Sequence, residues 1–342
     1  MGSSNAIASK AKAMYAKRLK DEDYRALLKK STVGEVASYL KNETDYASAL
    51  RDVKENNIHR GELETLLNRD LYYKELRLAT YAPIKERSFY KATLREIEIH
   101  RILTKIKQVT SSLYSEMFST ENFHYKDFCF DQNLLEEAKT YDEVAQALVK
   151  TPYYKIVLKY RPQNNHTVDY VSLEKEMDQL YDDMILADIE KYLKGKDKQD
   201  ALTIYLTAIE LRVITKIYRL KKYYHSSAES ILKYVDFSHI RMNKQLVDEL
   251  IHAQSGEEVL ALLEKSKYHF YMDEKEYIYI EYYAEKIKYN LSKRIMRFSS
   301  SPPLVFMTYI ILHQIEIMNL VNIVEGIRYG MNEEQIEKTC IF

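Results

Sequence analysis

The stretch Leu94-Arg95-Glu96-Ile97-Glu98-Ile99 is the first of three copies of one pattern in the chain. Its pattern, Leu-x-x-Ile-Glu followed by an aliphatic residue, returns at 206–211 and again at 312–317. Successive copies are about 110 residues apart, which is longer than the repeat of a solenoid protein and close to the size of a small helical unit. The sequence therefore predicts a threefold internal repeat.

The glutamate of each copy lies within an apolar helical stripe. The residues four before and four after it are aliphatic in every copy, and this spacing places them on the same helix face as the glutamate. A carboxylate in that setting must be hydrogen-bonded or must face a cavity, because an unpaired buried charge costs several kcal/mol. Two interpretations follow: a paired glutamate that fixes helix register, or a polar group that lines a shared central cavity.

A second repeated signal marks the start of an earlier helix in each copy. The pattern hydroxyl-x-x-Glu-Val occurs at 32–36, 140–144 and 255–259, each time preceded by an aliphatic pair and followed by a leucine and a tyrosine. It is the pattern of a capping box. In this motif the side-chain hydroxyl accepts a hydrogen bond from the N3 backbone amide, and the glutamate accepts one from the backbone amide of the cap residue. The expected tyrosines are Tyr46, Tyr154 and Tyr268, and the aliphatic pairs are Leu27-Leu28, Leu134-Leu135 and Leu250-Ile251.

The composition indicates an all-α protein. Only 7 of the 342 residues are Gly and 5 are Pro, and alternation of β-branched residues is rare. Together with the repeat, this predicts three helical units at 1–115, 116–228 and 229–342 that form one compact body. The charged segment Lys194-Gly195-Lys196-Asp197-Lys198 is expected to be a surface loop.

Charge and cysteine content exclude several classes of function. Basic and acidic residues number 51 each, without the basic surplus typical of nucleic-acid binding proteins. The two cysteines, Cys129 and Cys340, do not have the spacing of a metal site or of a disulfide framework. No phosphate-binding loop, zinc motif or nucleophile elbow occurs, so we expect no catalytic residues, no metal site and no cofactor.

Two segments bear on membrane association. The basic helix expected at 5–19 has a mainly alanine apolar side, which favours packing against the protein over insertion into a membrane surface. The most apolar run, Leu304 to Leu312, is too short to span a bilayer. We therefore expect no direct membrane insertion.

With these motifs identified, the chain resembles the C subunit of bacterial and archaeal A/V-type ATPases, which is the d subunit of eukaryotic V-type ATPases. The similarity extends over nearly the whole chain and includes Asn5-Ala6-Ile7, Glu316-Ile317-Met318-Asn319-Leu320 and Gly326-x-x-x-Gly330. Met318 stands where the family usually has Arg, and the other copies also depart from the Glu-Ile-Arg-Asn-Ile signature. The candidate central-cavity or register residues are Glu98, Arg101, Glu210, Arg212, Glu316 and Asn319.

The resemblance implies a funnel of three related helical units with pseudo-threefold symmetry around a central cavity. It also implies a non-catalytic role in the central stalk, peripheral to the cytoplasmic side of the membrane. The implied partners are the central shaft subunits D and F and the rotor ring of proteolipid subunits, with ATP hydrolysis elsewhere in the complex. Two alternatives stay open: a helical-repeat adaptor of an unrelated assembly, and an α-helical enzyme with a pocket where repeats meet.

Overall fold

The computed structural model describes residues 2–83, 86–111, 124–163, 167–266 and 280–342. All regular secondary structure in these ranges is helical, which confirms the predicted all-α class. The chain divides into two compact units. Unit 1 contains 1–90, 189–228 and 237–342, and unit 2 contains 91–188 and 229–236.

The first third of the chain begins with α1, which is followed by two short helices, a long helix and the helix that carries Glu98. Their bounds are α1 Gly2–Tyr15, α2 Asp21–Leu28, α3 Val33–Glu43, η1 Asp45–Ser48, η2 Glu55–Asn57, α4 Arg60–Ala79, η4 Phe89–Lys91 and α5 Ala92–Thr110.

The same order of elements returns twice: a short helix, a helix that begins at the capping motif, a long helix and the helix with the repeated glutamate. In the second copy these are α7 Gln132–Glu137, α8 Tyr141–Ala147, α10 Tyr170–Tyr192 and α11 Gly195–Tyr224, with α9 Tyr154–Lys159 inserted. In the third they are α13 Lys244–His252, α14 Gly256–Glu264, α15 Ile280–Phe298 and α16 Pro302–Arg328. The helices α12 Ala228–Tyr234 and α17 Glu333–Glu337 complete the chain.

The three capping motifs begin helices as predicted, with one consistent difference. The hydroxyls of Thr32, Thr140 and Ser255 accept from the N3 amides at 3.1, 3.3 and 3.2 Å. Each motif glutamate, however, accepts from the amide one residue before the cap, donated by Ser31, Lys139 or Gln254 at 2.8, 2.6 and 2.6 Å. The identical shift in all three copies indicates that the repeat extends to the geometry of its hydrogen bonds.

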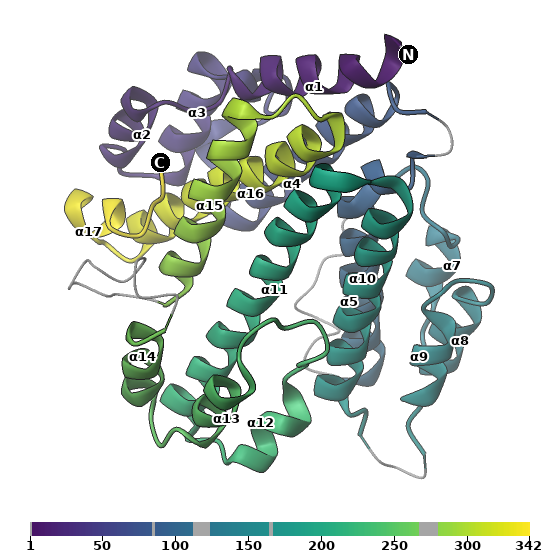
Figure 1. Cartoon of the computed structure of the whole chain (residues 1–342). Coiled ribbons are helices and arrows are strands. Elements are labelled where there is room, and N and C mark those ends of the chain that lie inside the picture. Colours follow the sequence, from purple (N-terminus) through teal and green to yellow (C-terminus); the bar gives the residue numbers. More distant parts are fainter. Residues whose placement is uncertain (1, 84–85, 112–123, 164–166, 267–279) are drawn as a thin grey trace. The chain divides into compact units, whose positions relative to one another are not determined.

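The core of unit 1 is built around α16, which packs against α1, α4 and α15 (Figure 1). Its residues are buried on nearly every side, as expected for a helix that is apolar around its whole circumference. The N-terminal helix packs onto it as predicted, with Ile7 and Ala11 fully buried and Lys12 Nζ donating to the Ser299 carbonyl at 2.7 Å.

The apolar run at Leu304 is the first part of the longer helix α16, Pro302–Arg328. Among the described residues, α16 is the helix that by length and composition could cross a membrane, with a mean hydropathy of 1.6 in its apolar window. The length of the run alone therefore does not decide whether this helix spans a membrane. Because 72% of that window is buried within the protein, the helix has the burial of a core helix.

In unit 2, the helix α5 packs against α7 and α8. Ile102, Ile106 and Leu148 are fully buried there, together with Leu173 and Met177 of α10. In α7, Leu135 is buried but its predicted partner Leu134 is 56% exposed. Adjacent residues of a helix point in different directions, and this six-residue helix buries only one of them.

The segment expected to be a charged loop at 194–198 is also different. Lys194 is the N-cap of α11, and Gly195 to Lys198 form its first turn. Gly195 has a φ of +55°, a value that favours glycine. The charged residues of this segment therefore lie at the exposed or partly exposed start of a helix and not in a loop.

Candidate functional site

The three repeated glutamates are buried on three corresponding helices, α5, α11 and α16. Glu98 is 3% exposed, Glu210 is fully buried and Glu316 is 6% exposed. Their neighbours four residues away are buried too, except Leu206, which is only partly buried. Burial of a carboxylate requires donors nearby, and each of the three has them.

Glu98 is held by residues that follow it along the chain in unit 2. Its Oε1 accepts from the Cys129 backbone N–H at 2.6 Å, and its Oε2 accepts from the Tyr153 hydroxyl at 2.6 Å. The Cys129 thiol also donates to Oε2 at 3.5 Å. The tyrosine that contacts Glu98 is therefore Tyr153, the residue before the Tyr154 that was noted after the capping motif.

Glu210 has a corresponding partner in unit 1. Its Oε1 accepts from the Arg241 backbone N–H at 2.5 Å, and its Oε2 pairs with the Arg241 guanidinium at 3.2 Å. A backbone amide and a cation therefore satisfy this fully buried carboxylate. Tyr268, the tyrosine that follows the third capping motif, lies outside the described residues.

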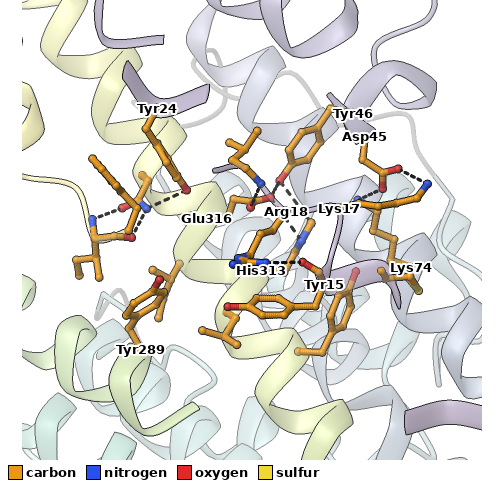
Figure 2. A pocket seen from close by; sticks show the side chains of 18 residues that line it. Tyr15, Lys17, Arg18, Tyr24, Asp45, Tyr46, Lys74, Tyr289, His313 and Glu316 are labelled. Carbon is orange, nitrogen blue, oxygen red and sulfur yellow. Dashed lines mark hydrogen bonds and ion pairs between the residues drawn. The ribbon is translucent and has the colours of Figure 1, made fainter. Parts of the chain in front are cut away.

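Glu316 accepts hydrogen bonds from residues near the beginning of the chain. Its Oε2 accepts from the Leu19 backbone N–H at 2.8 Å, and its Oε1 accepts from the Tyr46 hydroxyl at 2.7 Å. Figure 2 shows Glu316 of α16 between Tyr46 and Tyr24. A hydrogen bond thus joins residues that are 297 positions apart in the sequence.

In every copy the backbone donor lies two or three residues before the next short helix. Leu19 precedes α2, Cys129 precedes α7 and Arg241 precedes α13. The glutamate of the first copy therefore holds the start of the second copy. The second holds the third, and the third holds the first.

The surroundings of Glu316 form a small cavity with several ionisable groups (Figure 2). Its volume is about 40 Å³, which is enough for a few water molecules. His313 Nδ1 is 3.8 Å from Glu316 Oε1, and His313 Nε2 is 3.9 Å from Asp70 Oδ2. Lys74 Nζ pairs with Asp70 at 2.7 Å and with Asp45 at 3.5 Å.

Burial is the largest cause of the pKa shifts of these groups. It raises the pKa of Glu316, while the hydrogen bonds from Tyr46 and Leu19 act in the opposite direction. Burial, aided by the charge of Lys74, lowers the pKa of His313 well below its usual value. Burial also raises the pKa of Asp70 against the opposing effect of Lys74. His313 is therefore neutral at physiological pH, and the cavity avoids a buried imidazolium.

The remaining candidate residues have separate environments. Arg101 donates to Glu136 at 3.1 Å and lies over the ring of Tyr125, and Arg212 is exposed on α11. Asn319, one turn after Glu316 on α16, is fully buried and contacts Tyr24 and Ile341. Of the six candidates, Glu316 and Asn319 thus line one cavity. Whether the three glutamates also surround a central cavity stays a prediction.

Sequence reasoning did not identify the donors Leu19, Cys129 and Arg241. A usable signal was present, since Cys129 and Arg241 both follow their glutamate by 31 residues. In the three sites the carboxylates are held by hydrogen bonds from backbone amides and tyrosine hydroxyls, and Glu210 is also paired with the Arg241 guanidinium. In the described part of the chain, no group of three or more His, Cys, Asp or Glu residues is placed to hold a metal ion.

Comparison with known proteins agrees with the resemblance. The sequence profile described as "ATP synthase (C/AC39) subunit" matches residues 7–339. The chain is also 23% identical, over 261 residues, to the C subunit of the A-type ATP synthase of Methanosphaera stadtmanae. This match covers 76% of the chain and 65% of the relative, just under two thirds of its length.

Proposed function

The chain belongs to the ATP synthase (C/AC39) subunit family, and from this membership we propose that it is the non-catalytic coupling component of a rotary A/V-type ATPase. In this role it is the socket that joins the rotating shaft, subunits D and F, to the proteolipid rotor ring. It lies on the cytoplasmic side of the membrane and is held there by the ring. The profile match over residues 7–339 carries the proposal, because it spans all three copies of the repeat.

The cyclic order of the glutamate contacts supports the funnel that this role requires. Each copy is fastened to the start of the next, and Glu316 returns from the last copy to Leu19 in the first. We propose that the units 1–115, 116–228 and 229–342 surround an axis with pseudo-threefold symmetry. Units joined in such a closed order leave a central opening suited to a shaft.

The nature of the fastenings supports the transfer of torque. A buried hydrogen bond to a charged acceptor is stronger than one between neutral groups, and breaking it strands a carboxylate in a buried site. Each joint between copies therefore resists local opening. A coupling part must have this property, because movement between its units would absorb rotation of the shaft and less torque would reach the ring.

The test is binding of the purified chain to the D–F shaft pair, measured by calorimetry at two salt concentrations and several temperatures. We expect saturable binding with a negative heat-capacity change, the mark of buried apolar surface. The control is the same titration with an unrelated all-α protein of similar size in place of the chain. Absence of binding to the shaft, with and without the rotor ring, contradicts the socket role and favours the adaptor alternative.

A further inference from the structure

The end of α15 and the start of α11 form the walls of an open groove in unit 1 (Figure 1). The Ser301 hydroxyl, at the N-cap of α16, donates to Asp197 of α11 at 2.7 Å. This bond ties the turn that follows α15 to the first turn of α11. The groove has a volume of about 410 Å³, which is within the range of pockets that hold small organic molecules.

Three apolar side chains of α15 form a stripe that faces this groove. They are Leu291, Ile295 and Phe298, and their spacing of four and three residues places them on one side of the helix. Leu291 and Ile295 are partly buried, whereas Phe298, the last residue of the helix, is 75% exposed. The stripe thus ends in an aromatic ring that the described part of the chain leaves largely uncovered.

Five exposed cations lie in the groove or next to it. They are Lys194 and Lys196 of the α11 wall and Lys293, Arg294 and Arg297 of the α15 wall. None of the five is paired with a carboxylate in the described ranges of the chain. The carboxylates that line the groove are Asp197 and Asp200. Cations are therefore in excess here, although the chain as a whole has no net charge.

The helix dipole explains only part of this excess. Cations are favoured at the C-terminal end of a helix, as on α15, and disfavoured at the N-terminal end. Lys194 is nevertheless the N-cap of α11, and Lys196 lies in the first turn of that helix. Helix stability therefore does not account for a basic groove with cations on both walls. A negatively charged ligand accounts for both walls.

We propose that this groove and its surrounding cations bind the anionic headgroups of a lipid membrane surface. Clustered lysine and arginine side chains attract such a surface, and an aromatic ring beside them inserts where headgroups meet acyl chains. The exposed Phe298 favours a membrane over an acidic protein segment, because a lipid surface takes up a single ring without a shaped pocket. The contact requires no membrane-spanning helix, and it adds to the proposed coupling role without depending on it.

A pair of tryptophan substitutions tests the contact, because the chain contains no tryptophan. Phe298→Trp places one fluorophore in the proposed site. Tyr329→Trp is the matched control, since Tyr329 is also 75% exposed at the end of a helix and also follows an arginine, but acidic residues of α17 follow it. Each purified chain is titrated with vesicles of phosphatidylcholine alone and of phosphatidylcholine and phosphatidylglycerol in equal amounts. We expect a saturable blue shift of the emission only for Phe298→Trp with the anionic vesicles.

Two double substitutions then test the side chains themselves. Arg297→Gln with Phe298→Ser removes a cation and a ring from the proposed site, and Arg328→Gln with Tyr329→Ser removes the same groups from the control position. Affinity for the anionic vesicles is measured by co-sedimentation. We expect the first pair to weaken binding by about tenfold or more and the second pair to leave it unchanged. All four side chains are exposed, so the melting temperatures should match that of the unsubstituted chain.

Charge is tested separately. Replacement of Lys293, Arg294 and Arg297 together by glutamine should weaken binding by on the order of a hundredfold, because each cation near an anionic surface contributes roughly a fivefold gain in affinity. High salt should weaken binding of the unsubstituted chain in the same way.

Three outcomes overturn the proposal. The first is no shift of the Phe298→Trp emission, or an equal shift with neutral vesicles. The second is an equal loss of affinity in the two double variants, which would mean that the groove is not the lipid contact. The third is binding of a glutamate-rich peptide at the groove without binding of anionic vesicles, which would assign the site to an acidic protein segment. The vesicles contain no other subunit, so each of these outcomes leaves the shaft titration and the coupling role untouched.

Discussion

A buried carboxylate is tolerated when each of its oxygens accepts a hydrogen bond, and Glu316 meets this condition. One of its oxygens accepts from Leu19 and the other from Tyr46. The sequence predicted a polar group in an apolar stripe but not its partner, because a donor 297 residues away leaves no local signal. A repeated pattern can indicate that a residue matters without indicating what it contacts.

The first prediction concerns the hydrogen bonds that Glu316 accepts from Leu19 and Tyr46. We expect Glu316→Gln to lower the free energy of unfolding by about 1–3 kcal/mol, because the amide nitrogen of glutamine cannot accept a hydrogen bond from Leu19 or Tyr46. Chemical denaturation measures the change. The control is Glu62→Gln on the exposed first turn of α4, which should be nearly neutral. Equal effects of the two substitutions would contradict the assigned role of Glu316.

The second prediction concerns pH. Burial lowers the pKa of His313 below its unfolded value of about 6.5, so the unfolded chain takes up a proton first as the pH falls. Stability from this group is complete above pH 6.5 and decreases below it, by up to about 1.4 kcal/mol per pH unit. The raised pKa of Glu316 acts in the opposite sense, since the folded state then takes up a proton more readily than the unfolded chain.

Comparison of His313→Gln with the unsubstituted chain isolates the histidine, since both proteins contain Glu316. Unfolding measured between pH 7.5 and about 5 should show a shallower loss of stability for the variant. Parallel stability curves would mean that His313 does not titrate on unfolding.

The third prediction concerns the Cys129 thiol. Cys129 is exposed by its overall surface, but desolvation of its thiol and the nearby charge of Glu98 raise its pKa to about 12, so the reactive thiolate is scarce at neutral pH. We expect alkylation of Cys129 in a Cys340→Ser background to be on the order of a hundredfold slower than that of a free cysteine peptide. Glu98→Gln should restore part of the rate. Labelling at the rate of the free peptide would show that the thiol is not held against Glu98.

At the scale of elements, the sequence predicted where helices begin better than how they pack. The caps Thr32, Thr140 and Ser255 were correct because capping is local chemistry. The exposure of Leu134 was missed, because an aliphatic pair does not indicate which of two adjacent residues a short helix buries. The contact of Tyr153 with Glu98 was missed too, since the two residues are 55 positions apart and meet only in the folded chain.

The close approach of α17 to α16 gives the fourth prediction. A Cβ added at Gly326 would lie 2.5 Å from Ile336 Cγ1, so Gly326→Ala should destabilise the protein by about 1–3 kcal/mol even though alanine favours helix formation. Calorimetric melting measures this effect. Gly61→Ala, with no atom within 4 Å of the added Cβ, is the matched control and should be neutral or stabilising.

A double substitution separates contact from backbone effects. Ile336→Ala should cost less stability in the Gly326→Ala background than in the unsubstituted chain, because alanine lacks the Cγ1, Cγ2 and Cδ1 atoms that the added Cβ would meet. Strict additivity of the two changes would show that α17 does not press on Gly326.

At the scale of the whole molecule, the sequence was sufficient for the class and the family. Few glycines and prolines, helical periodicity and three copies of one motif predicted an all-α protein, which the structure confirms. The family motifs led to the same family that the sequence profile matches. The contacts between copies were not predicted, although the equal spacing of Cys129 and Arg241 from their glutamates was a signal for two of them, because the donors reach the glutamates only in the folded chain.

The most direct test of the coupling role is a rotary complex reconstituted in vesicles with and without this chain, with ATP hydrolysis and ion transport measured on the same sample. We expect hydrolysis to continue in both preparations, and ion transport to occur only when the chain is present and to return when it is added back. Ion transport at the full rate in the complex without the chain would contradict its proposed role as the link between shaft and ring.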